Sequence, residues 1–136
     1  MKTYQNLIAN QWVASDSGCT IAITNPATET IAGQVDLASA TQVRQACDAA
    51  ARAQRVWRKT PAIARAHHMR RFADALVARK DAIGAALALE SGKSLEDATK
   101  EAVYAADITR YHAEWARRIE GEVIPSDSPN ENLVLH

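Results

Sequence analysis

The longest periodic segment of the chain is "SLEDATKEAVYAADITRYHAEWARRIE", residues 94–120. Ser94 stands three residues before Asp97 and can cap a helix that starts after it. The inward stripe that helical spacing predicts is Leu95, Ala98, Ala102, Ala105, Ile108, Ala113, Ala116 and Ile119. The segment therefore predicts a helix of about 24 residues, ~36 Å long at the usual rise per residue.

The polar side of the same segment carries two pairs of opposite charge. Glu96 precedes Lys100 by four residues, and Arg110 precedes Glu114 by four. Residues at this spacing are neighbours on a helix, so we expect both pairs to form, each contributing a few tenths of a kcal/mol.

Three shorter helices are predicted upstream. A capping-box signature at Ser39 and Gln42 starts the first, which runs to about Trp57. Its predicted apolar stripe is Val43, Ala46, Cys47, Ala50, Ala53 and Trp57. Thr60 as N-cap and Pro61 as first helical residue start the second, which reaches about Arg79.

The third helix, around residues 83–90, ends at Gly92, which can adopt the left-handed conformation that closes helices. "SGKS" (residues 91–94) therefore marks one helix end and the next helix start. A phosphate-binding loop would need a glycine five residues before Gly92, where Leu87 stands.

Residues 4–35 predict two β-hairpins. Leu7-Ile8 and Trp12-Val13 flank a turn in which Asn10 can be left-handed. "TIAIT" and "TIAGQV" flank "NPATE" (25–29), whose Asn-Pro pair starts a turn. At the other end, two β-prone runs within residues 121–136 surround a Ser/Asp/Pro/Asn cluster.

The composition excludes several classes of partner and indicates a cellular compartment. Lys+Arg and Asp+Glu number 16 each, with no basic stripe, which argues against nucleic acid and against an anionic membrane as partners. No apolar run is long enough to span a membrane or to form a secretory signal, and two lone cysteines suit a reducing compartment. We expect a cytoplasmic protein.

The candidate reactive residues give no recognisable site. His67 and His68 are adjacent, so on a helix they point about 100° apart and cannot share a metal; we expect surface histidines. Cys47 lies on the predicted apolar stripe, so we expect it to be buried, and we expect Cys19 to lie in a loop. We expect Glu90 and Glu101 to be polar residues of helices and not acid/base groups. From the residues alone, this is an α+β chain without an identifiable active site.

Five stretches in order carry a resemblance: "TNPATETIAGQV" (24–35), "AQRVWRKTPAIAR" (53–65), "LALESGKS" (87–94), "KEAVYAAD" (100–107) and "RYHAEWARRIEGEVIPSDSPNENLVLH" (110–136). Together they resemble the N-terminal quarter to third of the NAD(P)-dependent aldehyde dehydrogenase superfamily, most closely the bacterial lactaldehyde/glycolaldehyde-type members. Asn10 and Glu29 stand where many members have glycine, and both are tolerated in turns.

The resemblance implies an α+β fragment of an α/β enzyme with N-terminal β-hairpins, four helices and the start of a C-terminal bridging hairpin. Residues 1–121 would be the N-terminal part of the cofactor-binding domain, with hairpins at 4–35 and helices at 39–120. Residues 122–136 would start the oligomerisation hairpin of a homo-oligomer. The full-length parent would oxidise an aldehyde to a carboxylic acid with NAD or NADP, by thiolate attack, hydride transfer and thioester hydrolysis.

The resemblance places the nucleophile, the general base and the dinucleotide loop in segments that this sequence lacks. We therefore expect a truncated, structural piece that binds no cofactor by itself. In some relatives a monovalent cation is held at a site that maps to the Thr24 carbonyl and Glu101; an ordinary salt contact is the alternative. The rival interpretation of the whole chain is a stand-alone helical protein-interaction module.

Overall fold

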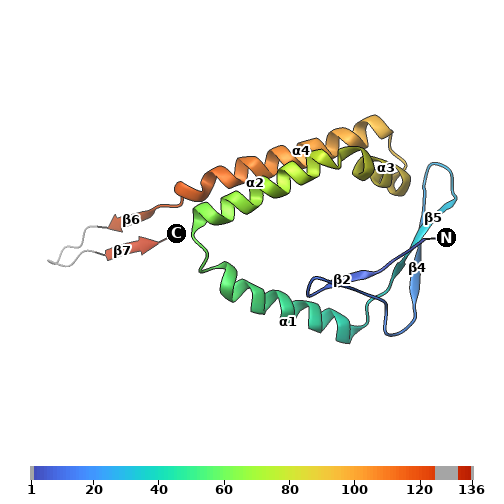
Figure 1. Ribbon diagram of the computed structural model, residues 1–136, viewed down its shortest axis with the longest axis horizontal. Coiled ribbons are helices and arrows are strands. Elements are labelled where there is room, and N and C mark those ends of the chain that lie inside the picture. Colours follow the sequence, from blue (N-terminus) through green and yellow to red (C-terminus); the bar gives the residue numbers. More distant parts are fainter. Residues whose placement is uncertain (1, 125–131, 136) are drawn as a thin grey trace.

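The computed structural model describes residues 2–124 and 132–135. Small β-sheets at the N-terminal end precede four helices, and a further pair of strands follows them. Helices α2 and α4 run side by side, α1 lies apart from them, and the β6–β7 strands project from the far end of the helix pair (Figure 1). The predicted order of hairpins, helices and a final hairpin is confirmed.

The first hairpin joins β2 (Asn6–Ile8) to antiparallel β3 (Gln11–Val13). Its two-residue turn consists of Ala9, with φ 51°, and Asn10, with φ 65°. Positive φ at both turn residues matches the right-handed twist of the strands. The turn predicted at Asn10 is therefore confirmed.

The second hairpin pairs β4 (Thr20–Thr24) with antiparallel β5 (Ile31–Asp36), as expected. A third strand, β1 (Thr3–Tyr4), adds to the other edge of β5 in parallel, which gives the order β1-β5-β4. This parallel strand was not predicted, because two residues carry no periodicity.

Helix α1 (Ala40–Trp57) begins with the predicted capping box. The Ser39 hydroxyl accepts from the Gln42 backbone N–H at 3.2 Å, and the Gln42 side chain accepts from the Ser39 N–H at 3.2 Å. Gln42 is buried, and its amide nitrogen also donates to the Ala14 carbonyl at 2.7 Å, which ties α1 to the segment after β3.

The buried stripe predicted for α1 is wrong. Val43, Cys47 and Trp57 are exposed, and Ala46 is only half-buried. Among the described residues α1 contacts mainly β2, so most of its apolar face has no covering layer. Periodicity identified an apolar face but could not say what covers it.

Helix α2 (Ala62–Ala78) starts one residue later than predicted, with Pro61 as its N-cap. The Thr60 hydroxyl donates back to the Val56 carbonyl at 3.3 Å, so Thr60 prolongs the end of α1 instead of capping α2. Helix α3 (Lys80–Ser91) ends at Gly92 with φ 72°, as predicted.

Helix α4 (Leu95–Ala113) is capped by Ser94, whose hydroxyl accepts from the Asp97 N–H at 3.1 Å. It tightens into the 3₁₀ turn η1 (Glu114–Arg117), so the α-helix is shorter than predicted and the 3₁₀ turn supplies the rest. The final strands β6 (Gly121–Ile124) and β7 (Asn132–Leu135) pair antiparallel; the turn between them lies outside the described residues.

The core of the described residues is made of small side chains. The buried hydrophobic residues are Ala66, Ala73, Ala98, Ala102, Ala106 and Ala113, all on α2 and α4. Alanines let the two helix backbones approach closely, but each buries little area. The predicted α4 stripe is partly wrong: Ala106 is buried in place of Ala105, and Leu95, Ile108 and Ile119 are exposed.

One predicted ion pair forms and one does not. Lys100 donates to Glu96 at 2.6 Å. Arg110 instead binds Asp74 of α2 at 2.9 Å and Asp107 at 3.1 Å, so its predicted pairing with Glu114 is wrong. The hydrogen bond to Asp74 is the main cause that raises the pKa of Arg110 above its ordinary value.

No described helix combines the length and apolarity that crossing a membrane requires.

Candidate functional site

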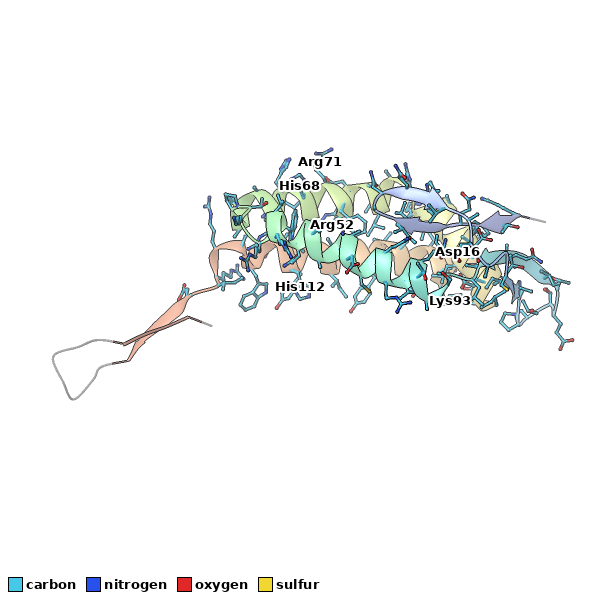
Figure 2. The ribbon with its side chains drawn as sticks, turned by 90° about the horizontal axis from the view of Figure 1, so that it is seen from below. Asp16, Arg52, His68, Arg71, Lys93 and His112 are labelled. Atoms are coloured by element: carbon cyan, nitrogen blue, oxygen red, sulfur yellow. The ribbon has the colours of Figure 1, made fainter. Side chains whose placement is uncertain are left out.

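The predicted cation ligands lie on two elements. Thr24 is the last residue of β4, and Glu101 lies on α4. The Glu101 carboxylate forms an ion pair with the Lys93 ammonium group, which comes from the short link between α3 and α4. An ordinary salt contact at Glu101, the alternative to a cation, is therefore present. Figure 2 labels Lys93 in this region.

The turn after Thr24 is held by its own hydrogen bonds. The buried Asn25 accepts at Oδ1 from the Ala27 N–H at 2.8 Å, and its backbone N–H donates to the Thr30 carbonyl at 2.9 Å. Glu29 adopts φ 58°, the conformation that a glycine would adopt without strain. The departure from glycine at this position is thus accommodated in the left-handed region.

This turn packs against the end of α3. A Cβ added at Gly92 would lie 2.9 Å from Pro26 Cγ and 3.1 Å from the Ala27 nitrogen. Gly92 therefore brings the end of β4 close to the segment that carries Lys93. What the arrangement offers chemically is one carboxylate, on Glu101, that the ammonium group of Lys93 already neutralises.

The other candidate residues do not converge. Cys19 is an exposed loop residue, as expected, whereas Cys47 is exposed and not buried as predicted. His67 and His68 are both exposed, which confirms the surface interpretation; their rings are 6.2 Å apart. Glu90 and Glu101 are exposed helix residues. Within residues 2–124 and 132–135, no three or more His, Cys, Asp or Glu side chains gather to hold a metal ion.

Two hollows remain. One, of about 190 Å³, lies between the three-stranded sheet and α3, with Tyr4, Ile23, Val35 and Leu89 among its lining and Glu90 as its single ionisable carboxylate. It is mainly apolar, and nothing in it is arranged for proton transfer.

The second hollow, of about 300 Å³, lies between the start of α2 and the end of α4; we call it the α2–η1 groove. Its lining includes Trp57, Arg65, Met69, His112, Trp115 and Ile119. The Trp57 ring also packs 5.9 Å from the ring of His68. Sequence reasoning missed this groove, because it joins residues almost 60 positions apart; the two tryptophans were its only local signal.

The chain's own residues do not fit a dinucleotide. A phosphate-binding turn needs glycines between a strand and the start of a helix. Gly18 lies in a loop, Gly33 in β5, Gly84 inside α3, Gly92 at a helix end and Gly121 in β6. None stands where such a turn would begin.

Comparison with known proteins gives the identity of the fold. The family model described as "Aldehyde dehydrogenase family" matches residues 12–136. Lactaldehyde dehydrogenase of Escherichia coli K12 is 41% identical over 128 residues, which cover 94% of this chain and 27% of that protein. A glutarate-semialdehyde dehydrogenase of Pseudomonas aeruginosa is 35% identical over 131 residues, 96% of this chain and 27% of that protein.

The solved structures that are similar to this chain belong to the same kind of enzyme as the relatives found by sequence. A crystal structure of lactaldehyde dehydrogenase from Escherichia coli superposes with a TM-score of 0.89 at 38% identity, over 93% of this chain and 27% of that one. The chain thus spans about 27% of the length of the curated relatives that it matches. The resemblance drawn from five motifs, and its direction toward lactaldehyde-type members, is confirmed: this chain belongs to the aldehyde dehydrogenase family.

Proposed function

We propose that the protein represented by this chain oxidises an aldehyde to a carboxylic acid with NAD or NADP as hydride acceptor. The observation that supports this most is the family match over residues 12–136. Among the matched structures, one is an NAD-dependent aldehyde dehydrogenase from Sinorhizobium meliloti and another is an NADP-dependent enzyme of Escherichia coli, so either cofactor is compatible with the likeness.

The role proposed for residues 1–121 is architectural: they are the N-terminal part of the cofactor-binding domain. Residues 122–136 begin an oligomerisation hairpin, and the whole protein is a cytoplasmic homo-oligomer. The pairing of β6 with β7, projecting from the end of the helix pair, supports a hairpin with a separate role (Figure 1). Neither nucleic acid nor a membrane belongs to this function.

A monovalent cation between the Thr24 carbonyl and Glu101 is a secondary proposal. The contact of Gly92 with the turn at Pro26 supports it, since Lys93, the residue after Gly92, forms an ion pair with Glu101. Lys93 is the competitor, because its ammonium group already neutralises the Glu101 carboxylate.

The test of the main proposal is a chimera. This chain replaces the segment that it matches in the Escherichia coli lactaldehyde dehydrogenase, and NAD-dependent oxidation of lactaldehyde is measured. If the chain has the proposed role, the chimera is soluble and turns over; the matched control is the unaltered enzyme. A soluble, well-folded chimera without turnover would contradict the proposal.

A further inference from the structure

Residues 52–71, which span the end of α1, the link to α2 and the start of α2, carry a local excess of positive charge. Lys+Arg number 16 in the whole chain, and seven of them lie in this stretch: Arg52, Arg55, Arg58, Lys59, Arg65, Arg70 and Arg71. No Asp or Glu stands between Asp48 and Asp74. The stretch thus has a formal charge of +7, and the neutral total leaves −7 on the remaining residues. The absence of a basic stripe, expected from the overall balance of charge, is therefore wrong for this segment.

The fold concentrates these charges around one junction. Helices α1 and α2 meet at the link formed by residues 58–61 and diverge from it (Figure 1). Along the helix axes, Arg52 lies ~8 Å from the end of α1 and Arg71 lies ~14 Å from the start of α2. Figure 2 labels Arg52 on α1 and both His68 and Arg71 on α2. We call the seven basic residues of this junction the basic corner.

Backbone and ring contacts hold the basic corner in place. The backbone N–H of Arg58 donates to the Gln54 carbonyl at 2.9 Å, and that of Thr60 donates to the Trp57 carbonyl at 3.0 Å. The ring of Trp57, on α1, packs 5.9 Å from the ring of His68, on α2. These contacts fix where the charged side chains emerge, and charges that are already positioned bind a partner at a lower entropic cost.

Nothing in the described part of the chain neutralises the basic corner. Six of its seven residues are exposed, and Arg65 is half-buried. The ion pairs formed within residues 2–124 and 132–135 use other cations, which are Lys80, Lys93, Lys100 and Arg110. Repulsion among seven like charges opposes the compact state, and an anionic partner would relieve it. Arginine, which supplies six of the seven, binds carboxylates through two parallel hydrogen bonds.

The charge on the rest of the chain selects the class of partner. A nucleic acid or an anionic membrane extends well beyond the basic corner, and its outer parts would meet the residues that carry the formal charge of −7. A short acidic segment of a protein meets the basic corner alone. We propose that the basic corner binds a short acidic protein segment, whose carboxylates pair with the arginines of α1 and α2. This binding goes beyond the proposed function and does not depend on it.

The test measures the binding of fluorescein-labelled hexaglutamate to this chain by fluorescence anisotropy at low ionic strength. We expect saturable binding that weakens as NaCl is added, because salt screens exposed charge pairs. The combined variant Arg55→Gln, Arg58→Gln and Arg71→Gln should weaken binding roughly tenfold, since each exposed pair contributes modestly and three are removed.

The matched control is the combined variant Lys2→Gln, Arg44→Gln and Arg79→Gln, which changes the net charge equally at exposed residues outside the basic corner. It should retain most of the binding, and far-UV circular dichroism of both variants should match that of the unaltered chain. Absence of hexaglutamate binding, or an equal loss in the control variant, would overturn the proposal. Tighter binding of a long single-stranded DNA would also overturn it, because the partner would then be a nucleic acid. So would an oligomer of the chain, seen by sedimentation, that the basic-corner variant dissociates, because a second copy would then occupy the corner.

Discussion

Gly84 of α3 lies directly against Thr99 of α4: a Cβ added at Gly84 would be 2.9 Å from the Thr99 Cα and 3.0 Å from its nitrogen. The added Cβ would also meet the Thr99 hydroxyl oxygen, which a rotation of the side chain could move, but the two backbone atoms cannot rotate away. Gly84 is also buried. The crossing of α3 and α4 therefore depends on the absence of a side chain at this position.

The first prediction is that Gly84→Ala destabilises the chain. Alanine favours a helix over glycine by about 1 kcal/mol, but overpacking against a backbone costs typically 1–3 kcal/mol and the helices must separate. We expect a net loss of about 1 kcal/mol or more in the free energy of unfolding, measured by urea denaturation. Ala85→Ser, on the exposed side of the same helix, should change it little. An equally stable Gly84→Ala variant would show that α3 and α4 can move apart freely.

Features of the fold that depend on neighbouring residues could be predicted from the sequence, and contacts between residues far apart along the chain could not. The capping box at Ser39, the Ser94 cap and the left-handed Gly92 are local signals, and all three are confirmed. The Arg110–Asp74 pair joins residues 36 positions apart, so no local pattern could choose it over Glu114. The prediction that Thr60 caps α2 was wrong for a local reason, because the Thr60 hydroxyl donates to a carbonyl of the preceding helix.

Burial was predicted least well, because it depends on what covers a helix. The apolar periodicity of α1 is real, yet Cys47 and Val43 are exposed, since the described residues supply no layer over them. The same applies to Leu95 and Ile108 on α4. The candidate cation residues came from the family resemblance alone; the Lys93–Glu101 pair was not predicted at all.

The second prediction concerns Gly92. Its φ of 72° strains any residue with a Cβ, and an added Cβ would come within 2.9 Å of Pro26. Gly92→Ala should lower the free energy of unfolding by about 1–2 kcal/mol from the strained backbone alone. Gly18→Ala separates the backbone strain from the contact with Pro26. Gly18 also has a positive φ, at 68°, but nothing lies within 4 Å of a Cβ added there. Urea denaturation of both variants should rank Gly92→Ala as the more damaging, and the reverse order would exclude a tight contact with the turn.

The third prediction concerns the bridge between α2 and α4. Asp74→Asn removes the main hydrogen-bond acceptor of Arg110 and should lower the melting temperature slightly, less so at high salt because exposed pairs are screened. Glu114→Gln removes a carboxylate of the adjoining turn η1 that does not bind Arg110 in the described structure, and it should have no such salt-dependent effect. Thermal unfolding at low and high NaCl distinguishes the two. Equal behaviour would mean that Arg110 changes partners in solution.

The fourth prediction tests the cation proposal. If Thr24 and Glu101 hold a monovalent cation, KCl or NaCl should stabilise the chain more than choline chloride at equal ionic strength. The gain is about 1 kcal/mol when the free cation is roughly five times its dissociation constant. Glu101→Gln should abolish the difference, and Lys93→Gln should enlarge it, because the carboxylate loses its competing ammonium group. Glu96→Gln is the matched control on the same helix. Identical melting in all three salts would leave Glu101 with its salt contact alone.

The fifth prediction is that the 136-residue chain oxidises no aldehyde by itself. Neither Cys19 nor Cys47 is hydrogen-bonded to a His, Asp or Glu side chain in the described residues, so neither thiol has a base that could activate it. No glycine of the chain is placed to bind a dinucleotide. Steady-state assays with lactaldehyde and either NAD or NADP should therefore show no turnover above buffer, for the unaltered chain and for Cys47→Ala alike. Turnover that Cys47→Ala removes would make the exposed Cys47 a nucleophile, and the architectural role proposed for residues 1–121 would have to be abandoned.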